Sequence, residues 1–216
     1  MIKIAPSILS SDRGRLSDEI KAMTDAGADW IHIDVIDGHF APNITFGPWV
    51  VEVARKATNI PLDCHLMVSD PLTYAPLFAK AGADYVSVHL EAALHTHKIL
   101  SSIIEAGAKP GLAINPNTSL ALLDDTLEML ELIVLMGVNP GFSGQPFIPA
   151  TTKKTKKLSD TLSKLGLAIP IEIDGGVTDK TAADLVAAGA TVLVSGSHLF
   201  SSSNYAEAIT NLRQSL

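Results

Sequence analysis

The tripeptide Ala-Gly-Ala occurs four times in this chain, at residues 26–28, 81–83, 106–108 and 188–190. Each copy follows a stretch with helical spacing of apolar residues and precedes an apolar or β-branched run. Glycine readily adopts the left-handed backbone conformation with which many helices end. Each copy therefore predicts the end of a helix and the start of a strand, which is a structural role and not a ligand site.

The same alternation extends along the whole chain. Apolar runs predict eight strands, at residues 2–6, 30–35, 61–67, 85–89, 110–114, 132–136, 171–174 and 192–195. Helices are predicted at residues 15–26, 47–57, 71–81, 96–106, 120–127, 150–165, 180–188 and 205–214. Eight strands that alternate with eight helices in a chain of this length are typical of the closed parallel (β/α)8 barrel, the TIM barrel.

A doubly wound open sheet is the competing α/β architecture. It usually has a glycine-rich turn directly after its first strand, whereas here residues 7–10 read Ser-Ile-Leu-Ser. The 216 residues, of which 47% are hydrophobic, suffice for one substantial core. No linker interrupts the pattern, so we expect a single domain at residues 1–216.

Charge and cysteine content exclude several classes of protein. The formal net charge of −7 argues against a general nucleic-acid surface, which would be basic. The only cysteine is Cys64, so no intrachain disulfide is expected. No apolar run approaches a membrane span, and the first strand starts too early to leave room for a signal peptide. We therefore expect a cytoplasmic protein that binds neither nucleic acid nor membrane.

Histidine and acidic residues interrupt three of the predicted strands. His32 and Asp34 share one strand face, as do Asp63 and His65, because side chains alternate along a strand, and Asp174 ends the seventh strand. Buried carboxylates and imidazoles are costly unless they are paired or bound to metal. Their donor atoms suit zinc, iron(II), manganese or cobalt. His32, Asp34, His65 and Asp174 are therefore candidate ligands of one divalent metal, with structural hydrogen bonds as the alternative.

Other polar and sulfur-containing residues near these strands leave alternatives open. Asp63 either orients an imidazole or forms a plain buried ion pair. Met67 and Met136, at strand ends, either fill the core or wall a pocket around the metal. His89 and Glu91 have positions suited to the pocket floor, but the sequence assigns them no role.

Glycine-rich segments follow the last three predicted strands. They are residues 139–145, Gly175 with Gly176, and Gly196 with Ser197. Backbone N–H groups near glycines and at helix starts bind anions, and TIM barrels often hold phosphate with the loops after strands seven and eight. These loops therefore predict a phosphate site. Because they contain no Lys or Arg, we expect backbone N–H groups and not salt bridges to hold the phosphate.

Motifs spread from Ala5 to about Phe200 resemble the ribulose-phosphate 3-epimerase family. They are APSILS at 5–10, HID at 32–34 with DG at 37–38, PN at 42–43, HLMV at 65–68, NPGF at 139–142 with GQ at 144–145, DGG at 174–176 and GS at 196–197. The resemblance implies a (β/α)8 barrel of the ribulose-phosphate-binding type. It also implies an isomerase of the pentose phosphate pathway that interconverts D-ribulose 5-phosphate and D-xylulose 5-phosphate.

By this resemblance, residues of the chain match the family's site. His32, Asp34, His65 and Asp174 match the metal ligands, and Asp34 and Asp174 match the two acid/base groups. The expected substrate-binding residues are Ser7, His65, Gly141, Phe142, Ser143, Gly144, Asp174, Gly175, Gly176, Gly196 and Ser197. The expected cofactor is one divalent ion, zinc or iron(II) first and manganese or cobalt as alternatives. The expected partner is a small sugar phosphate, and we expect a homo-oligomer.

Two positions depart from the family pattern. Ile36 stands where methionine is common, and Gly137 stands where a small hydroxyl residue is common. If they wall the pocket, substrate fit would differ, but neither change removes a candidate ligand or acid/base group.

Two carboxylates suit an epimerisation beside a ketone. One proton leaves one face of the carbon and another returns to the opposite face, so a single base does not easily serve both faces. The enediolate formed between these steps needs a nearby cation.

Three other functions are weighed against this one. Allulose-6-phosphate 3-epimerase shares the chemistry and differs in substrate length. Related barrel lyases usually have a lysine among the strand-end carboxylates, and none is present here. A non-catalytic sugar-phosphate sensor would not need both Asp34 and Asp174.

Overall fold

A computed structural model describes residues 2–215 and contains a closed ring of parallel strands. The strands are β1 (Lys3–Pro6), β2 (Ile31–Ile36), β3 (Leu62–Met67), β4 (Tyr85–His89), β5 (Lys109–Ile114), β6 (Leu132–Met136), β7 (Ile171–Asp174) and β8 (Val192–Ser195). They pair in the order β1-β8-β7-β6-β5-β4-β3-β2. Ser7, directly after β1, bridges His32 of β2 in parallel and completes the ring. The predicted (β/α)8 barrel is confirmed.

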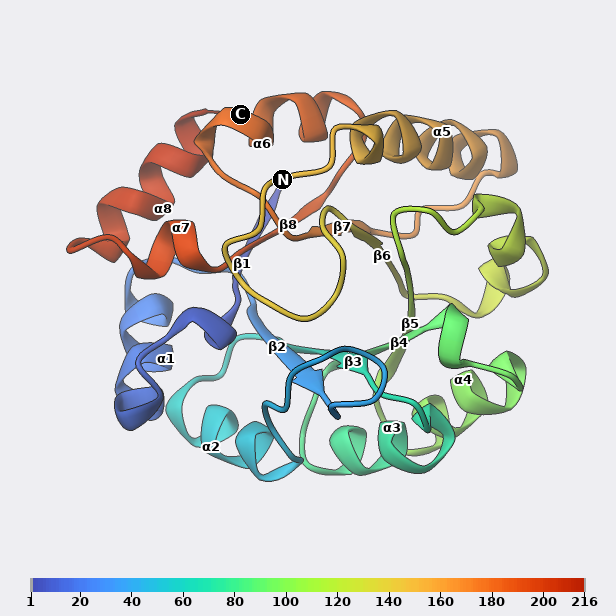
Figure 1. Ribbon diagram of the computed structural model, residues 1–216, viewed down its shortest axis with the longest axis horizontal. Coiled ribbons are helices and arrows are strands. Elements are labelled where there is room, and N and C mark those ends of the chain that lie inside the picture. The colour runs from blue at the N-terminus through green and yellow to red at the C-terminus, as the bar shows by residue number, and fades with distance from the viewer. Residues whose placement is uncertain (1, 216) are drawn as a thin grey trace.

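Helices surround the ring on the outside (Figure 1). They are α1 (Leu16–Asp25), α2 (Trp49–Ala57), α3 (Pro71–Lys80), α4 (Thr96–Glu105), α5 (Ala150–Leu165), α6 (Asp179–Ala187), α7 (Ser197–Phe200) and α8 (Tyr205–Gln214). Short 3-10 turns η1 (Ile8–Ser10), η2 (Arg13–Arg15) and η3 (Leu90–Ala92) fall in the loops. The predicted helix-ending glycines Gly27, Gly82, Gly107 and Gly189 all have positive φ, from +95° to +110°.

The predicted helix at residues 120–127 is the main difference from the expected elements. The structure has the 3-10 segment η4 (Leu120–Met129) there. Asp124, Asp125 and Thr126 form α-helix poorly, and only Leu123 and Leu127 are buried against the barrel. Weak local propensity and a narrow buried face therefore leave the segment in 3-10 turns. Several other elements begin or end one or two residues away from the predicted boundaries.

Two apolar layers stabilise the barrel. Ile31 and Ile33 of β2 point outward into the core between the sheet and the helices, as does the buried Cys64 of β3. A second, smaller cluster lies among inward-facing residues, and its Trp30 and Tyr85 rings stack 4.6 Å apart. Inward positions nearer the carboxyl ends of β2, β3 and β7 hold polar residues instead.

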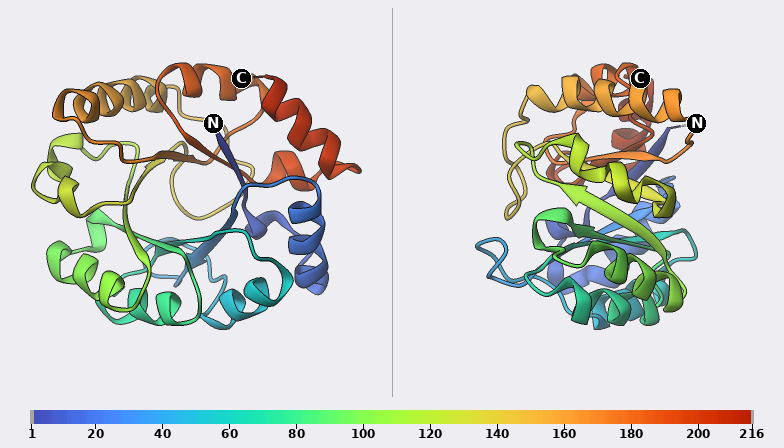
Figure 2. Two further views of the ribbon diagram at one scale, coloured as in Figure 1. Left: turned by 180° about the vertical axis from the view of Figure 1, so that it is seen from behind. Right: turned by 90° about the vertical axis from the view of Figure 1, so that its right-hand side faces the viewer.

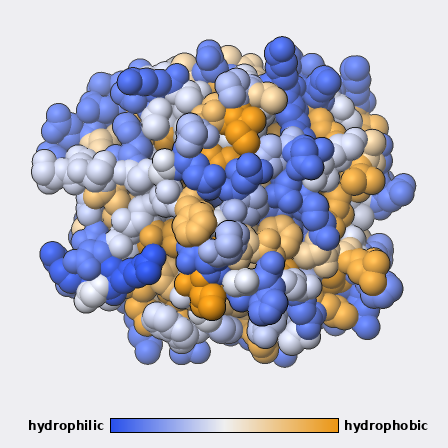
Figure 3. Space-filling model, in the orientation of Figure 1, coloured by the Kyte–Doolittle hydropathy of each residue, from blue (hydrophilic) through white to orange (hydrophobic). Residues whose placement is uncertain are grey.

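Loops after β2 and β6 project from the carboxyl-terminal side of the strands (Figure 2, right). The loop after β6 also crosses the barrel mouth in Figure 1. Seen from this side, hydrophilic residues cover much of the rim, and hydrophobic ones gather in several places nearer the centre (Figure 3). Among residues 2–215, no helix has the length and apolarity that crossing a membrane requires.

Candidate active site

Four candidate ligands meet at the carboxyl-terminal end of the barrel. His32 and Asp34 come from β2, His65 from β3 and Asp174 from the end of β7. Strand register sets Asp34 beside His65. All four side chains are buried, and one donor atom from each lies within 4.8 Å of the others. The structure therefore brings together residues far apart in the sequence.

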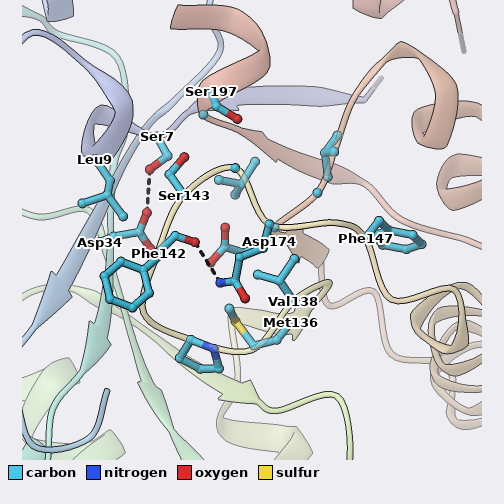
Figure 4. A pocket seen from close by; sticks show the side chains of 18 of the residues that line it. Ser7, Leu9, Asp34, Met136, Val138, Phe142, Ser143, Phe147, Asp174 and Ser197 are labelled. Carbon is cyan, nitrogen blue, oxygen red and sulfur yellow. Dashed lines mark hydrogen bonds between the residues drawn. The ribbon is translucent and has the colours of Figure 1, made fainter. Parts of the chain in front are cut away.

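Short contacts connect the four groups. His65 Nδ1 lies 3.3 Å from Asp34 Oδ1 and 3.2 Å from Asp174 Oδ2. His32 Nε2 lies 3.2 Å from Asp34 Oδ1 and 3.9 Å from Asp174 Oδ2. The hydroxyl of Ser7 donates to Asp34 Oδ2 over 2.5 Å. Figure 4 shows this bond, with Asp34 and Asp174 near each other in the pocket.

Burial and close contact shift the pKa values of these groups. Burial alone lowers the pKa of His65, but hydrogen bonds to Asp174 and Asp34 outweigh it and raise that pKa to about 9. Burial also opposes the raised pKa of His32, which results from the charges of Asp34 and Asp63. Burial disfavours the charged form of Asp34, yet the two imidazoles lower its pKa. The Asp34 carboxylate therefore needs positive charge close by.

The donor set fits one divalent metal ion. Two imidazole nitrogens and two carboxylate oxygens are a common combination for zinc, iron(II), manganese or cobalt. Ligand atoms about 2.0–2.2 Å from a shared ion would lie roughly 3–4 Å apart. The four nitrogen–oxygen separations given above, 3.2, 3.3, 3.2 and 3.9 Å, agree with this spacing. A cation here would also balance the buried carboxylates.

A second layer of acidic side chains lies around His32. Asp63 Oδ2 accepts from His32 Nδ1 over 2.6 Å, so the imidazole that Asp63 orients is on the neighbouring strand. Glu172 has no role among the sequence-based predictions. It is fully buried, with Oε1 3.5 Å from His32 Nδ1, and burial together with the charge of Asp63 raises its pKa well above the usual value. Its position two residues before Asp174, on the same strand face, was the available signal.

A pocket of about 340 Å³ opens above this cluster. Asp34 and Asp174 line it, whereas His32 and His65 are fully buried below and do not. The other predicted substrate residues in the lining are Ser7, Gly141, Phe142, Ser143, Gly144, Gly175, Gly176, Gly196 and Ser197. Met67 and Met136 are both buried in apolar clusters and both line the pocket, so each residue fills the core and also walls the pocket.

The predicted phosphate side of the pocket has little room for side chains at its glycines. A Cβ on Gly196 would lie 2.6 Å from Ser10 Oγ, and one on Gly176 would lie 2.7 Å from Phe147 Cα. The hydroxyls of Ser10 and Ser143 are themselves 2.6 Å apart. Ser143 and Ser197 lie toward the same side of the pocket as Ser7 (Figure 4). Backbone and hydroxyl groups therefore dominate this wall.

Lys180 changes the expectation of a phosphate site without a basic side chain. It lies in the first turn of α6, just beyond the loop that contains Gly175 and Gly176, and it lines the pocket. Lys180 belongs to the helix that follows the loop, so the composition of the loops alone does not reveal it. The pocket lining therefore includes one basic residue beside its glycines and hydroxyl groups.

The two departures from the family pattern have different surroundings. Ile36 lines the pocket. Gly137 is not part of that lining, because it is packed against the end of β7, where an added Cβ would lie 2.1 Å from the carbonyl oxygen of Gly175. Only Ile36 is therefore in a position to touch substrate.

The fold and the site together define an enzyme class, a (β/α)8 barrel with a candidate metal cluster and a pocket lined by glycines and hydroxyl groups at its carboxyl-terminal end. The crystal structure of KGPDC from Streptococcus mutans superimposes with a TM-score of 0.74 at 14% identity, covering 100% of this chain and 97% of that one. 3-Hexulose-6-phosphate synthase does so with a TM-score of 0.70 at 18% identity, covering 100% of both chains. At such low identity these structures show the fold alone.

Sequence relatives narrow the class to one family. A family model described as the ribulose-phosphate 3 epimerase family matches residues 3–200. The ribulose-phosphate 3-epimerase of Bacillus subtilis is 48% identical over 218 residues, covering 100% of both chains. That of Synechocystis sp. is 49% identical over 99% of this chain and 94% of the relative, and the chloroplastic ribulose-5-phosphate-3-epimerase of Arabidopsis thaliana is 46% identical over 99% and 77%. This chain belongs to the ribulose-phosphate 3-epimerase family.

Proposed function

We propose that this chain is a metal-dependent epimerase that interconverts D-ribulose 5-phosphate and D-xylulose 5-phosphate at C3. The observation that carries the proposal is a pair of buried carboxylates, Asp34 and Asp174, that line one pocket from the separate strands β2 and β7. The 48% identity over the full chain to a ribulose-phosphate 3-epimerase supports ribulose 5-phosphate as the substrate.

Asp34 and Asp174 perform the proton transfers in this proposal. One carboxylate takes the C3 proton from one face of the bound sugar, and the other delivers a proton to the opposite face. The two roles exchange when the reaction runs in reverse. Ser7 donates to Asp34 Oδ2 and so holds that carboxylate in a fixed orientation. Each acid/base group of this kind contributes roughly 10²–10⁴-fold to the rate.

His32, Asp34, His65 and Asp174 would hold one divalent ion, zinc or iron(II) first and manganese or cobalt as alternatives. When bound, such an ion supplies positive charge for the oxygens that become negative during proton transfer. Asp63 orients His32 from behind through its 2.6 Å hydrogen bond. Ile36, Met67 and Met136 contribute apolar walls that limit water beside the acid pair.

The sugar phosphate binds with its phosphate remote from the acid pair. Backbone N–H groups near Gly176 and Gly196, the Ser197 hydroxyl and the ammonium group of Lys180 are the proposed contacts, and all four residues line the pocket. The loop after β6 contacts the loop after β2, where Gly141 O accepts from Asn43 Nδ2 over 2.9 Å. The distance between the acid pair and the phosphate contacts then sets the preferred chain length.

The unit of function is the single domain at residues 1–216, and we propose that it associates as a homo-oligomer. Large exposed hydrophobic side chains support association, among them Ile44 at 76% and Leu94 at 89% exposure. Light scattering of the purified protein measures its mass, and a monomer at micromolar concentration would contradict association. The cytoplasmic location stays a prediction from the sequence.

A direct assay tests the proposed function. Purified protein of measured metal content is assayed with ribulose 5-phosphate and with allulose 6-phosphate on one preparation. We expect a higher kcat/KM for the pentulose, with trace hexulose activity, because one extra carbon is worth only about 1–3 kcal/mol in an apolar pocket. A higher kcat/KM for allulose 6-phosphate would make the hexulose phosphate the preferred substrate and leave the proposed mechanism unchanged. No activity with either substrate would contradict the proposed epimerase function.

A further inference from the structure

His89, the last residue of β4, lies directly behind the candidate ligand His65. Its side chain is fully buried. The two Nε2 atoms are 2.9 Å apart, and the ring planes differ by 29°. This edge of His65 is the one away from the metal cluster, because its Nδ1 is the atom near Asp34 and Asp174.

Glu91 holds the other edge of His89 and is itself held at both oxygens. Its Oε2 lies 3.0 Å from His89 Nδ1. Its Oε1 accepts from the backbone N–H of Asn115 over 2.8 Å and from the Thr118 hydroxyl. Lys154 Nζ donates to the carbonyl of Asn115 over 2.8 Å and so fixes the same segment from α5. Glu91 therefore has little freedom to rotate.

The directions of these hydrogen bonds follow from donor and acceptor chemistry. An ionised carboxylate only accepts, so the proton of neutral His89 is on Nδ1 and its Nε2 has a lone pair. Two Nε2 atoms at 2.9 Å need one donor, so the proton of neutral His65 is on Nε2. The lone pair of His65 is then on Nδ1, which faces the carboxylates of the cluster.

We propose that His89 and Glu91 are positioning residues that fix the tautomer of His65, so that its Nδ1 lone pair is free to bind the metal ion. The inference rests on the proposed function only in assuming a metal at the cluster. The arrangement at His32 is similar, because Asp63 accepts a hydrogen bond directly from His32 Nδ1 and leaves the Nε2 lone pair for the cluster. One imidazole is oriented by a carboxylate and the other by a carboxylate acting through a second imidazole.

Glu91→Gln is the sharpest variant, because the side-chain shape is kept while one acceptor becomes a donor. The Asn115 N–H requires an acceptor, so the amide oxygen of the new side chain takes that place and its NH2 points at His89 Nδ1. Both this NH2 and the His65 Nε2–H then point at a neutral ring with a single lone pair. We expect zinc affinity, measured by competition with a chromophoric chelator, to fall by roughly 10- to 100-fold.

Two controls separate this effect from general damage. Thr118→Val removes one partner of Glu91 without reversing any bond to His89, and Glu128→Gln makes the same chemical change at an exposed site in η4. Both should bind zinc as tightly as the unsubstituted protein. Zinc affinity in Glu91→Gln that equals the controls would overturn the proposal.

Nitrogen-15 NMR of the zinc-loaded, unsubstituted protein tests the inference without any variant. We expect His89 to have its proton on Nδ1 and none on Nε2, and a proton on His89 Nε2 would overturn the assignment. The tests also distinguish the two proposals. If the protein is an active epimerase and Glu91→Gln does not change its zinc affinity, the positioning role alone is refuted. If Glu91→Gln weakens zinc binding but the unsubstituted protein is inactive on pentulose phosphates, the proposed function alone is refuted.

Discussion

Gly196, at the start of α7, leaves no space for a side chain on the phosphate side of the pocket. An added Cβ would lie 2.6 Å from Ser10 Oγ and 3.4 Å from Ser143 Oγ. We expect Gly196→Val to raise KM for ribulose 5-phosphate more than it lowers kcat, because the phosphate is remote from the reacting carbon. Some loss of kcat is allowed, since remote binding also acts in the transition state. Steady-state kinetics beside the exposed control Gly14→Ala measure this, and an unchanged KM would argue against a phosphate site here.

Asp34 and Asp174 are expected to be separately essential. Asp34→Asn and Asp174→Asn each retain the size of the side chain but remove a base, so each should lose roughly 10²-fold or more in kcat. Circular dichroism should show that the fold survives in both. Asp125→Asn, a change at an exposed position in η4, is the matched control. Near-normal turnover in either of the first two variants would contradict proton transfer by two carboxylates.

Lys180 gives a third test at the scale of single residues. Lys180 lines the pocket and is exposed, so the attraction of its charge to a phosphate is partly screened by solvent. Lys180→Met should therefore raise KM by less than about tenfold, which corresponds to less than about 1.4 kcal/mol, and leave kcat nearly unchanged. Lys153→Met, an exposed site on α5, should have no effect. Equal KM and kcat values in the two variants would indicate that backbone and hydroxyl groups alone bind the phosphate.

Strand alternation explains which site residues the sequence could reveal. His32 and Asp34 occupy alternate positions where apolar residues are expected, so their inward direction was predictable. The role of Glu172 was missed because only the strand-end carboxylate was considered, although Glu172 shares its face. The contact between His89 and His65 was not predictable, because it depends on how two neighbouring strands bring their rings together. The place of Lys180 in the pocket lining was not predictable either, because it depends on where the start of α6 lies relative to the pocket.

At the scale of elements, Asp37 connects the loop after β2 to the loop after β3. Its Oδ1 accepts from the N–H groups of His39 and Phe40 over 2.8 and 2.9 Å, and its Oδ2 accepts from that of Ser69 over 2.7 Å. Burial opposes ionisation, but these N–H groups lower the pKa of Asp37 to about 2.

The lowered pKa of Asp37 predicts a pH dependence. The stabilisation is complete above the unfolded pKa of about 3.9 and is lost as pH falls toward 2. Allowing for solvent screening, it is on the order of 1 kcal/mol. Urea unfolding at pH 5 and pH 2.5 should show that Asp37→Asn loses less stability between the two values than the unsubstituted protein. Equal losses would assign the acid sensitivity to other carboxylates.

The boundaries and types of the elements show where the local sequence determines the backbone conformation and where tertiary packing determines it. Ala-Gly-Ala ends its helices as predicted, since a positive φ at the glycine is a local requirement. The segment η4 differs because weak helix formers surround only two buried leucines, and tertiary contacts do not extend them into an α-helix. Its conformation therefore could not be inferred from its apolar spacing alone.

The whole molecule is expected to unfold in a single transition, as one domain with one continuous barrel. Metal that binds only the folded state adds about 2.7 kcal/mol at a free concentration 100 times its Kd. For a chain of this size, that raises Tm by roughly 5–10 °C. Calorimetry with and without zinc should show this rise in the unsubstituted protein and not in His65→Ala. Two separate transitions would contradict the single domain.

The hydrogen bonds between β1 and β8 have a consequence for how the protein is made. β1 is synthesised first, but its partner β8 follows only after nearly the whole chain. At about 5–20 residues per second, the ribosome needs roughly 10–40 s to span that interval. During this time the growing sheet has unpaired edges that attract other chains. The loops after β7 and β8, which complete the pocket, are made after its other lining residues, so a nascent chain has no complete pocket until Ser197 has been synthesised.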